Sequence, residues 1–168
     1  LLSLLLIASG VLFMVVGARD VWPPDEPRYA VVAREMIESG EYLIPHLGGE
    51  VYPDKPPLFF WCIALCSLVT GGVNQAAAVL PSILSALATL LATARLGWLL
   101  GGRRSELAGL LAAGLLATSY RFISQATVGQ IDMLLTALET WALVLLVDAL
   151  WLGGRRPKAK VVAAYALI

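Results

Sequence analysis

The chain has 168 residues, of which 59% are hydrophobic and only 14% are charged, and its mean hydropathy is +0.80. Soluble domains carry about 25% charged residues, so this composition excludes an ordinary soluble domain and indicates an integral membrane protein. Basic and acidic side chains balance to a net charge of zero, which gives no basic signature for a nucleic-acid partner.

Long apolar segments predict an all-α, multi-spanning helix bundle in a single domain, residues 1–168. A membrane-spanning helix needs roughly 20 apolar residues. The predicted spans are 1–17, 76–100, 106–123, 131–152 and 161–168. The first span lacks the basic start and the small-residue cleavage site of a signal peptide. Because the chain starts at Leu1 and stops inside an apolar run, we expect it to be the N-terminal part of a longer protein.

The segment 18–75 is predicted to be an external loop that carries amphipathic helices. From Pro27 to Ser39, apolar residues recur at i, i+3, i+4, i+7 and i+8, and Gly40 suits the position after a helix end. This stripe predicts a helix lying on the membrane surface. The following apolar run, 58–70, has 13 residues and reaches about 20 Å. It is too short for a core of about 30 Å, so we expect it to lie in the interface or to re-enter.

Basic residues set the predicted orientation. The loops 101–104 and 153–160 are rich in Arg and Lys and are separated by two spans, so they lie on one side. The positive-inside rule makes that side cytoplasmic. The loop 18–57 holds four basic and eight acidic residues, which suits the opposite, external side. The turn 124–132 is expected on that external side too.

Three charged residues of the external side are candidates for function, and each also has a plainer explanation. Asp25 stands at the start of the predicted surface helix, where the dipole favours a carboxylate, so it caps the helix or performs chemistry. Lys55 precedes two prolines and either anchors to lipid headgroups or binds a phosphate. Asp132 lies at the outer edge of an apolar helix, where an ionisable residue is a functional candidate.

The remaining polar residues of the spans give weaker signals. Glu139 is expected to bond to a neighbouring helix, or else to line a pocket, and Asp148 is expected to be solvated near the cytoplasmic end. Cys62 and Cys66 share one helical face and are expected to be packed, reduced thiols. With His46 as the single histidine, no metal site and no cofactor are predicted.

The loop "DEPRYAVVAREMIESGEYLIPHLGGEVYPDKPPLFFW", which starts at Asp25, resembles the first external loop of the C-type glycosyltransferases that use polyprenyl-phosphate sugars. It is most similar to the aminoarabinose transferases that modify lipid A, and more distantly to the protein O-mannosyltransferases. The shared pattern is D-E-x-R-Y-A, R-E-M-x-x-S-G-(D/E) and P-x-x-x-G-x-x-Y-x-x-K-P-P, over residues 25–57. The turn before Asp132 matches more weakly. Asp54 stands where lipid A-modifying members often carry Glu, which leaves the subfamily open.

The resemblance implies a role for each matching residue. Asp25 and Glu26 match the family's catalytic acidic pair, in which the first residue orients or deprotonates the acceptor. The residues implied in substrate binding are Lys55, which matches the donor-phosphate ligand, and Asp132, Arg28 and Tyr52.

The resemblance therefore implies an inverting glycosyltransferase in the bacterial cytoplasmic membrane, with its active site facing the periplasm or exterior. A polyprenyl-phosphate sugar is the implied donor, and a lipid A-like molecule, a glycan or a protein is the acceptor. The chemistry suits the residues, because a carboxylate can activate a hydroxyl and a cation can stabilise the departing phosphate. Two other classes stay open: a transporter or channel with Asp25 and Asp132 along a proton or solute path, and a non-catalytic assembly subunit.

Overall fold

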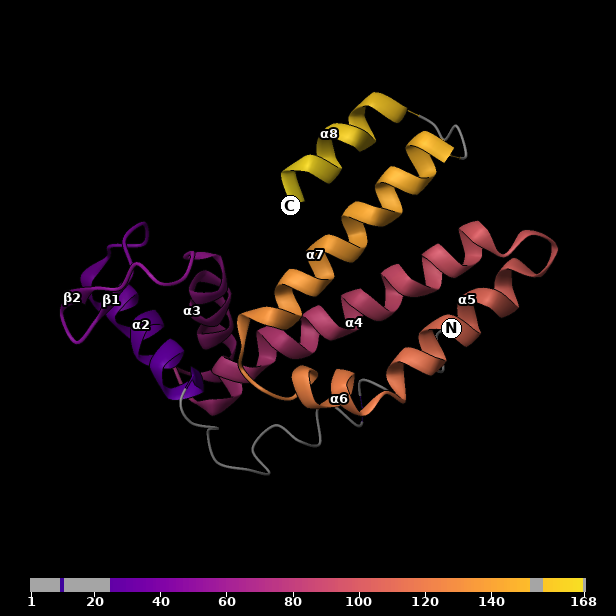
Figure 1. Cartoon of the computed structure of the whole chain (residues 1–168). Helices are drawn as coiled ribbons and strands as arrows, with labels where there is room; N and C mark the ends of the chain where they lie inside the picture. Colours follow the sequence, from indigo (N-terminus) through magenta and orange to yellow (C-terminus); the bar gives the residue numbers. More distant parts are fainter. Residues whose placement is uncertain (1–9, 11–24, 152–155, 168) are drawn as a thin grey trace.

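The computed structural model in Figure 1 describes residue 10 and residues 25–151 and 156–167. The described part is a helix bundle with one antiparallel hairpin, β1 (His46–Leu47) and β2 (Glu50–Val51). Its α-helices are α2 (Asp25–Ser39), α3 (Leu58–Thr70), α4 (Gln75–Leu100), α5 (Ser105–Ala117), α6 (Tyr120–Ala126), α7 (Ile131–Leu146) and α8 (Pro157–Leu167). This confirms the predicted helical class, and the hairpin is an unpredicted addition. The predicted span 1–17 lies outside the described residues, apart from Gly10.

Helix α2 forms where the apolar stripe predicted it. Its buried face is made by Tyr29, Val32 and Met36, while Ile37 is 40% exposed. The helix ends as expected at Gly40, whose φ of 72° is in the left-handed region and whose N–H donates to the Met36 carbonyl at 3.0 Å. The apolar stripe faces protein, so α2 is packed within the structure along this face.

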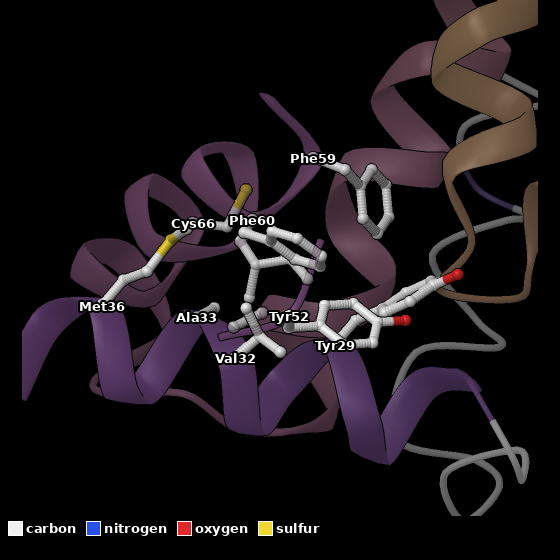
Figure 2. Close-up of a cluster of buried hydrophobic side chains, with 10 residues drawn as sticks. Tyr29, Val32, Ala33, Met36, Tyr52, Phe59, Phe60 and Cys66 are labelled. Atoms are coloured by element: carbon white, nitrogen blue, oxygen red, sulfur yellow. The ribbon is translucent and has the colours of Figure 1, made fainter. Parts of the chain in front are cut away.

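Aromatic rings join α2 to α3 and to the loop between them (Figure 2). The Tyr29 ring meets Phe59 and Phe60 edge-on, with centroid distances of 5.9 and 5.6 Å. The centroids of the Tyr52 and Phe60 rings lie 6.2 Å apart. Edge-to-face pairs of this kind stabilise by about 0.5–1.5 kcal/mol beyond the burial of their area. Ile131, at the start of α7, packs against the same cluster, which also includes Ala77 of α4.

Two helices of the described part are long and apolar enough to cross a membrane. One is α4, with 26 residues, and the other is α7 continued by the π-helical turn η2 (Val147–Trp151), with 21 residues in total. Helix α3 has 13 residues and does not reach that length, as predicted. Helix α8 begins at Pro157, four residues before the predicted span 161–168.

The predicted single span 106–123 is broken in the structure. The 3-10 turn η1 (Gly102–Arg104) and α5 form one arm, α6 forms the other, and the arms meet at a bend of 71°. The cause is local: the Thr118 hydroxyl bonds the Leu115 carbonyl at 3.0 Å, and Ser119 is extended with ψ of 124°. The sequence predicted one continuous span because both arms are apolar.

Glycines allow α4 and α5 to pack at close range. A Cβ on Gly97 would lie 2.8 Å from the Ala108 carbonyl oxygen, and a Cβ on Gly109 would lie 2.6 Å from the Ala94 carbonyl oxygen. Small residues at such positions let the backbones of membrane helices approach each other. The two helices run antiparallel, as the hairpin connection through η1 requires.

Helices α4 and α7 start at the same end of the bundle. The Trp141 indole N–H donates to the Ala88 carbonyl at 3.1 Å, and six residues earlier along α4, Ser82 bonds Gln130 just before α7. The basic residue Arg103 after α4 therefore lies at the end toward which α7 also runs. This agrees with the predicted placement of the two basic loops on one side.

Several side chains differ from expectation. Asp148 is not simply solvated, because it forms an ion pair with Lys160 of α8, which folds back along α7. Glu139 is exposed and bonds no residue in the described part of the chain, so the expected contact with a neighbouring helix is not found there. Cys62 and Cys66 are free thiols, as predicted, and burial raises the pKa of both.

Candidate functional site

The start of α2 is hydrogen-bonded to the turn that precedes α7. Glu26 is 0% exposed, and its Oε1 accepts a hydrogen bond from the Gly129 N–H at 2.6 Å, across 103 residues of sequence. A buried carboxylate is costly unless it is hydrogen-bonded, and a bond to an ionised acceptor is short and strong. The contact therefore joins the predicted external loop to the α6–α7 turn.

The glycine of this contact cannot be enlarged without a shift. A Cβ on Gly129 would lie 2.8 Å from the Ala78 carbonyl oxygen of α4 and 3.2 Å from Cγ of Glu26. Next to it, Ser82 of α4 donates to the Gln130 carbonyl at 3.2 Å and accepts from the Gln130 N–H at 3.3 Å. Three elements, α2, α4 and the α6–α7 turn, thus meet at one point.

The two predicted acidic residues flank this meeting point in the sequence. Asp25 is the first residue of α2, next to Glu26, and its side chain lies outside the described residues. Asp132 is exposed in the first turn of α7, three residues after Gly129. The structure brings together the backbone segments that carry the two acids. A separation of roughly 10–15 Å between their carboxylates, the span of a small-molecule pocket, stays a prediction.

Lys55 lies between β2 and the start of α3. It is half-buried and forms no hydrogen bond or ion pair with the residues that the structure describes. Helix α3 begins at Leu58 after Pro57, so its N-terminal dipole adds positive potential near this lysine. An anion such as a phosphate would be favoured here on both counts.

Tyr52 and Arg28 occupy different environments. Tyr52 is 7% exposed, and its backbone N–H donates to the Pro45 carbonyl at 2.7 Å. Figure 2 shows the hydroxyls of Tyr29 and Tyr52 pointing toward the same side of the cluster. Arg28 is half-buried on the first turns of α2. Contact of either residue with substrate stays a prediction.

The hydrogen-bonded contact between Glu26 and Gly129, called the joint below, was not predicted from the sequence. Gly129 and Ser82 were not singled out, because a glycine in a turn and a serine in an apolar helix are common. The catalytic role of Glu26 stays a prediction, and its buried bond to the Gly129 N–H was not foreseen. The joint is identified by the bond between a loop carboxylate and a distant backbone amide, and that bond can be seen only in the three-dimensional structure.

One cavity lies away from this contact. It has a volume of about 760 Å³ and is lined by α4, α5 and α7 near the basic end, with Arg95, Trp98 and Trp141 among its residues. The Arg95 guanidinium sits 4.3 Å from the centre of the Trp98 ring. Among the residues described, no group of three His, Cys, Asp or Glu side chains is placed to hold a metal ion.

Comparison with known proteins matches residues 54–167 to the family described as dolichyl-phosphate-mannose-protein mannosyltransferase. An undecaprenyl phosphate-alpha-4-amino-4-deoxy-L-arabinose arabinosyl transferase of Pseudomonas aeruginosa PAO1 is 35% identical over 161 residues, which are 93% of this chain and 28% of the relative. The protein of the same name from Pseudomonas savastanoi pv. phaseolicola is 40% identical over 95 residues, 54% of this chain and 18% of the relative. The chain thus spans less than a third of these relatives.

Two solved structures share the fold. The crystal structure of ArnT from Cupriavidus metallidurans bound to undecaprenyl phosphate matches with a TM-score of 0.84 and 22% identity, covering 99% of this chain and 30% of that one. The apo structure of the same protein matches with a TM-score of 0.83 and 24% identity, covering 99% and 31%. Almost the whole of this chain therefore follows the arrangement of one segment of a larger membrane protein.

Proposed function

Because this chain belongs to the dolichyl-phosphate-mannose-protein mannosyltransferase family, we propose that it is part of a membrane glycosyltransferase. The enzyme would move a sugar from a polyprenyl-phosphate donor to an acceptor, with inversion at the anomeric carbon. The observation that carries this proposal is the joint between Glu26 and Gly129, which gathers the acidic ends of α2 and α7 at one point beside the external loop.

The reaction we propose is a direct displacement. The acceptor hydroxyl oxygen attacks the anomeric carbon, and the bond from that carbon to the phosphate oxygen breaks on the opposite face. The hydroxyl proton passes to Asp25, while the polyprenyl phosphate leaves with the bonding electrons. Phosphate is a good leaving group, so no general acid is needed, and Lys55 stabilises its charge.

The relatives support a particular donor class. The arabinosyl transferases that match along the chain are named for undecaprenyl phosphate and 4-amino-4-deoxy-L-arabinose. We therefore propose an aminoarabinose-like sugar on undecaprenyl phosphate as donor, and a lipid A-like acceptor ahead of a glycan or a protein. The relatives described above do not favour the transport alternative.

The proposed enzyme lies in a membrane. The family and the apolar helices make this a membrane protein. We propose the bacterial cytoplasmic membrane, with the site at the outer ends of α2 and α7 facing the periplasm. At that level a lipid-linked sugar would be presented to the acidic residues from the lipid side.

The full-length enzyme, purified in detergent and supplied with labelled undecaprenyl-phosphate sugar and lipid A, tests this proposal. We expect transfer by the natural protein and a loss of about 10²–10⁴-fold in Asp25→Asn, the usual size of a general-base effect. Glu38→Gln is the matched control, because Glu38 is an exposed acid of the same helix. Unchanged turnover in Asp25→Asn would leave Asp25 as a helix cap only.

A further inference from the structure

The Glu26 side chain has no exposed surface that could contact a substrate. It is 0% exposed, and its Oε1 is engaged by the Gly129 N–H at 2.6 Å. A side chain in this position cannot touch a donor or an acceptor, although it stands next to Asp25.

Gly129 is shaped to receive this carboxylate. The space that its Cβ would occupy is already filled by the Ala78 carbonyl oxygen, at 2.8 Å, and by Cγ of Glu26, at 3.2 Å. The absence of a side chain is what lets the loop, α4 and the turn approach together. The reciprocal bonds between Ser82 and Gln130 hold the same turn from its other side.

The joint fixes the spacing of two backbone segments. One end of it is the residue that follows Asp25, whose Cα is about 3.8 Å away across a trans peptide. The other end is three residues before Asp132, at the entrance to α7. A displacement of the Glu26–Gly129 contact would therefore move the two acidic positions relative to each other.

We propose that Glu26 is a positioning residue, which sets Asp25 against the outer end of α7 through the Gly129 amide and takes no part in proton transfer. This rests on the proposed function, because Asp25 is the group being positioned. It assigns different work to the two adjacent carboxylates. The first is the proposed base, and the second is a buried hydrogen-bond acceptor.

The test compares Glu26→Gln, Glu26→Ala and Asp25→Asn in the full-length enzyme. The Gln amide oxygen still accepts from Gly129, so we expect kcat within a few fold of the natural enzyme and an unchanged acid limb in the pH profile. Glu26→Ala removes the acceptor, and we expect kcat of the folded fraction to fall about 100-fold, as a misplacement of about 1 Å can cause. A Gln variant as inactive as Asp25→Asn would show a catalytic carboxylate and overturn the proposal.

A second measurement does not depend on sugar transfer. Hydrogen exchange of the peptide that contains Gly129 should be slow in the natural protein and in Glu26→Gln, and faster in Glu26→Ala. Equal exchange in all three proteins would overturn the joint itself. An Ala variant that exchanges faster yet turns over normally when folded would reduce Glu26 to a stabilising contact. If the natural enzyme transfers no sugar, the proposed function fails, and the exchange experiment still decides whether the joint exists.

Discussion

Ser82 and Gln130 exchange two hydrogen bonds between the interior of α4 and the turn that leads into α7. The Ser82 hydroxyl donates to the Gln130 carbonyl at 3.2 Å and accepts from the Gln130 N–H at 3.3 Å. Ser82 is 0% exposed, so water cannot replace it as a partner. One hydroxyl thus bonds both backbone groups of Gln130, the residue just before α7, and the Gln130 N–H also donates to the Val128 carbonyl at 2.9 Å.

The substitution Ser82→Ala should destabilise the protein. It removes the two bonds to Gln130, whose N–H also donates to the Val128 carbonyl at 2.9 Å, so we expect a cost of about 0.5–1.5 kcal/mol. We expect a lower thermal midpoint in detergent, measured by intrinsic fluorescence or circular dichroism. Ser124→Ala is the control, because the Ser124 hydroxyl forms no hydrogen bond within the described part of the chain. Equal midpoints for the two variants would contradict the importance of the pair.

The close approach of α4 and α5 predicts opposite effects for two glycines of one helix. Gly109→Ala places a Cβ 2.6 Å from the Ala94 carbonyl oxygen, so the helices must separate, and overpacking of this kind costs about 1–3 kcal/mol. Around Gly114 nothing lies within 4 Å of a Cβ, so Gly114→Ala should be neutral or gain up to about 1 kcal/mol of helix propensity. Thermal unfolding in one detergent measures both. A stabilising Gly109→Ala would show that α4 and α5 are further apart than described.

The sequence predicted those features that depend on local periodicity. Helix α2 was placed within two residues because its apolar stripe and Gly40 both act locally, and α3 because its length is bounded by Pro57 and Gly71. The break between α5 and α6 was missed, since hydropathy does not report the extended backbone of Ser119. The role of Glu26 was also out of reach, because it depends on an amide 103 residues away.

The orientation of the bundle can be checked in intact cells. The basic residue Arg103 lies at the end of the bundle opposite the start of α7, and the external loop should face outward. In a variant with Cys62→Ala and Cys66→Ala, a cysteine at the exposed position Glu50 should react with an impermeant thiol reagent. A cysteine at the exposed position Arg103 should react only after permeabilisation. The reverse pattern would invert the topology and remove the periplasmic site.

Lys55 offers the last prediction, because its charge has no partner among the residues described. Removal of the charge in Lys55→Ala should weaken donor binding, since a charge-assisted hydrogen bond contributes about 1.5–3 kcal/mol, or roughly 10–150-fold in affinity. Lys55→Arg should retain most of the binding, because it keeps the cation near the start of α3. Lys158→Ala is the control, since Lys158 is an exposed cation of α8, far along the chain.

The measurement for Lys55 is binding of undecaprenyl phosphate to the full-length protein, followed by thermal shift. The natural protein should be stabilised by the lipid in proportion to its occupancy, and Lys55→Ala should need a higher lipid concentration for the same shift. Stability without lipid should change little, because no described contact is lost. If Lys55→Ala binds the lipid phosphate as tightly as the natural protein, Lys55 is a headgroup anchor and another cation must hold the donor.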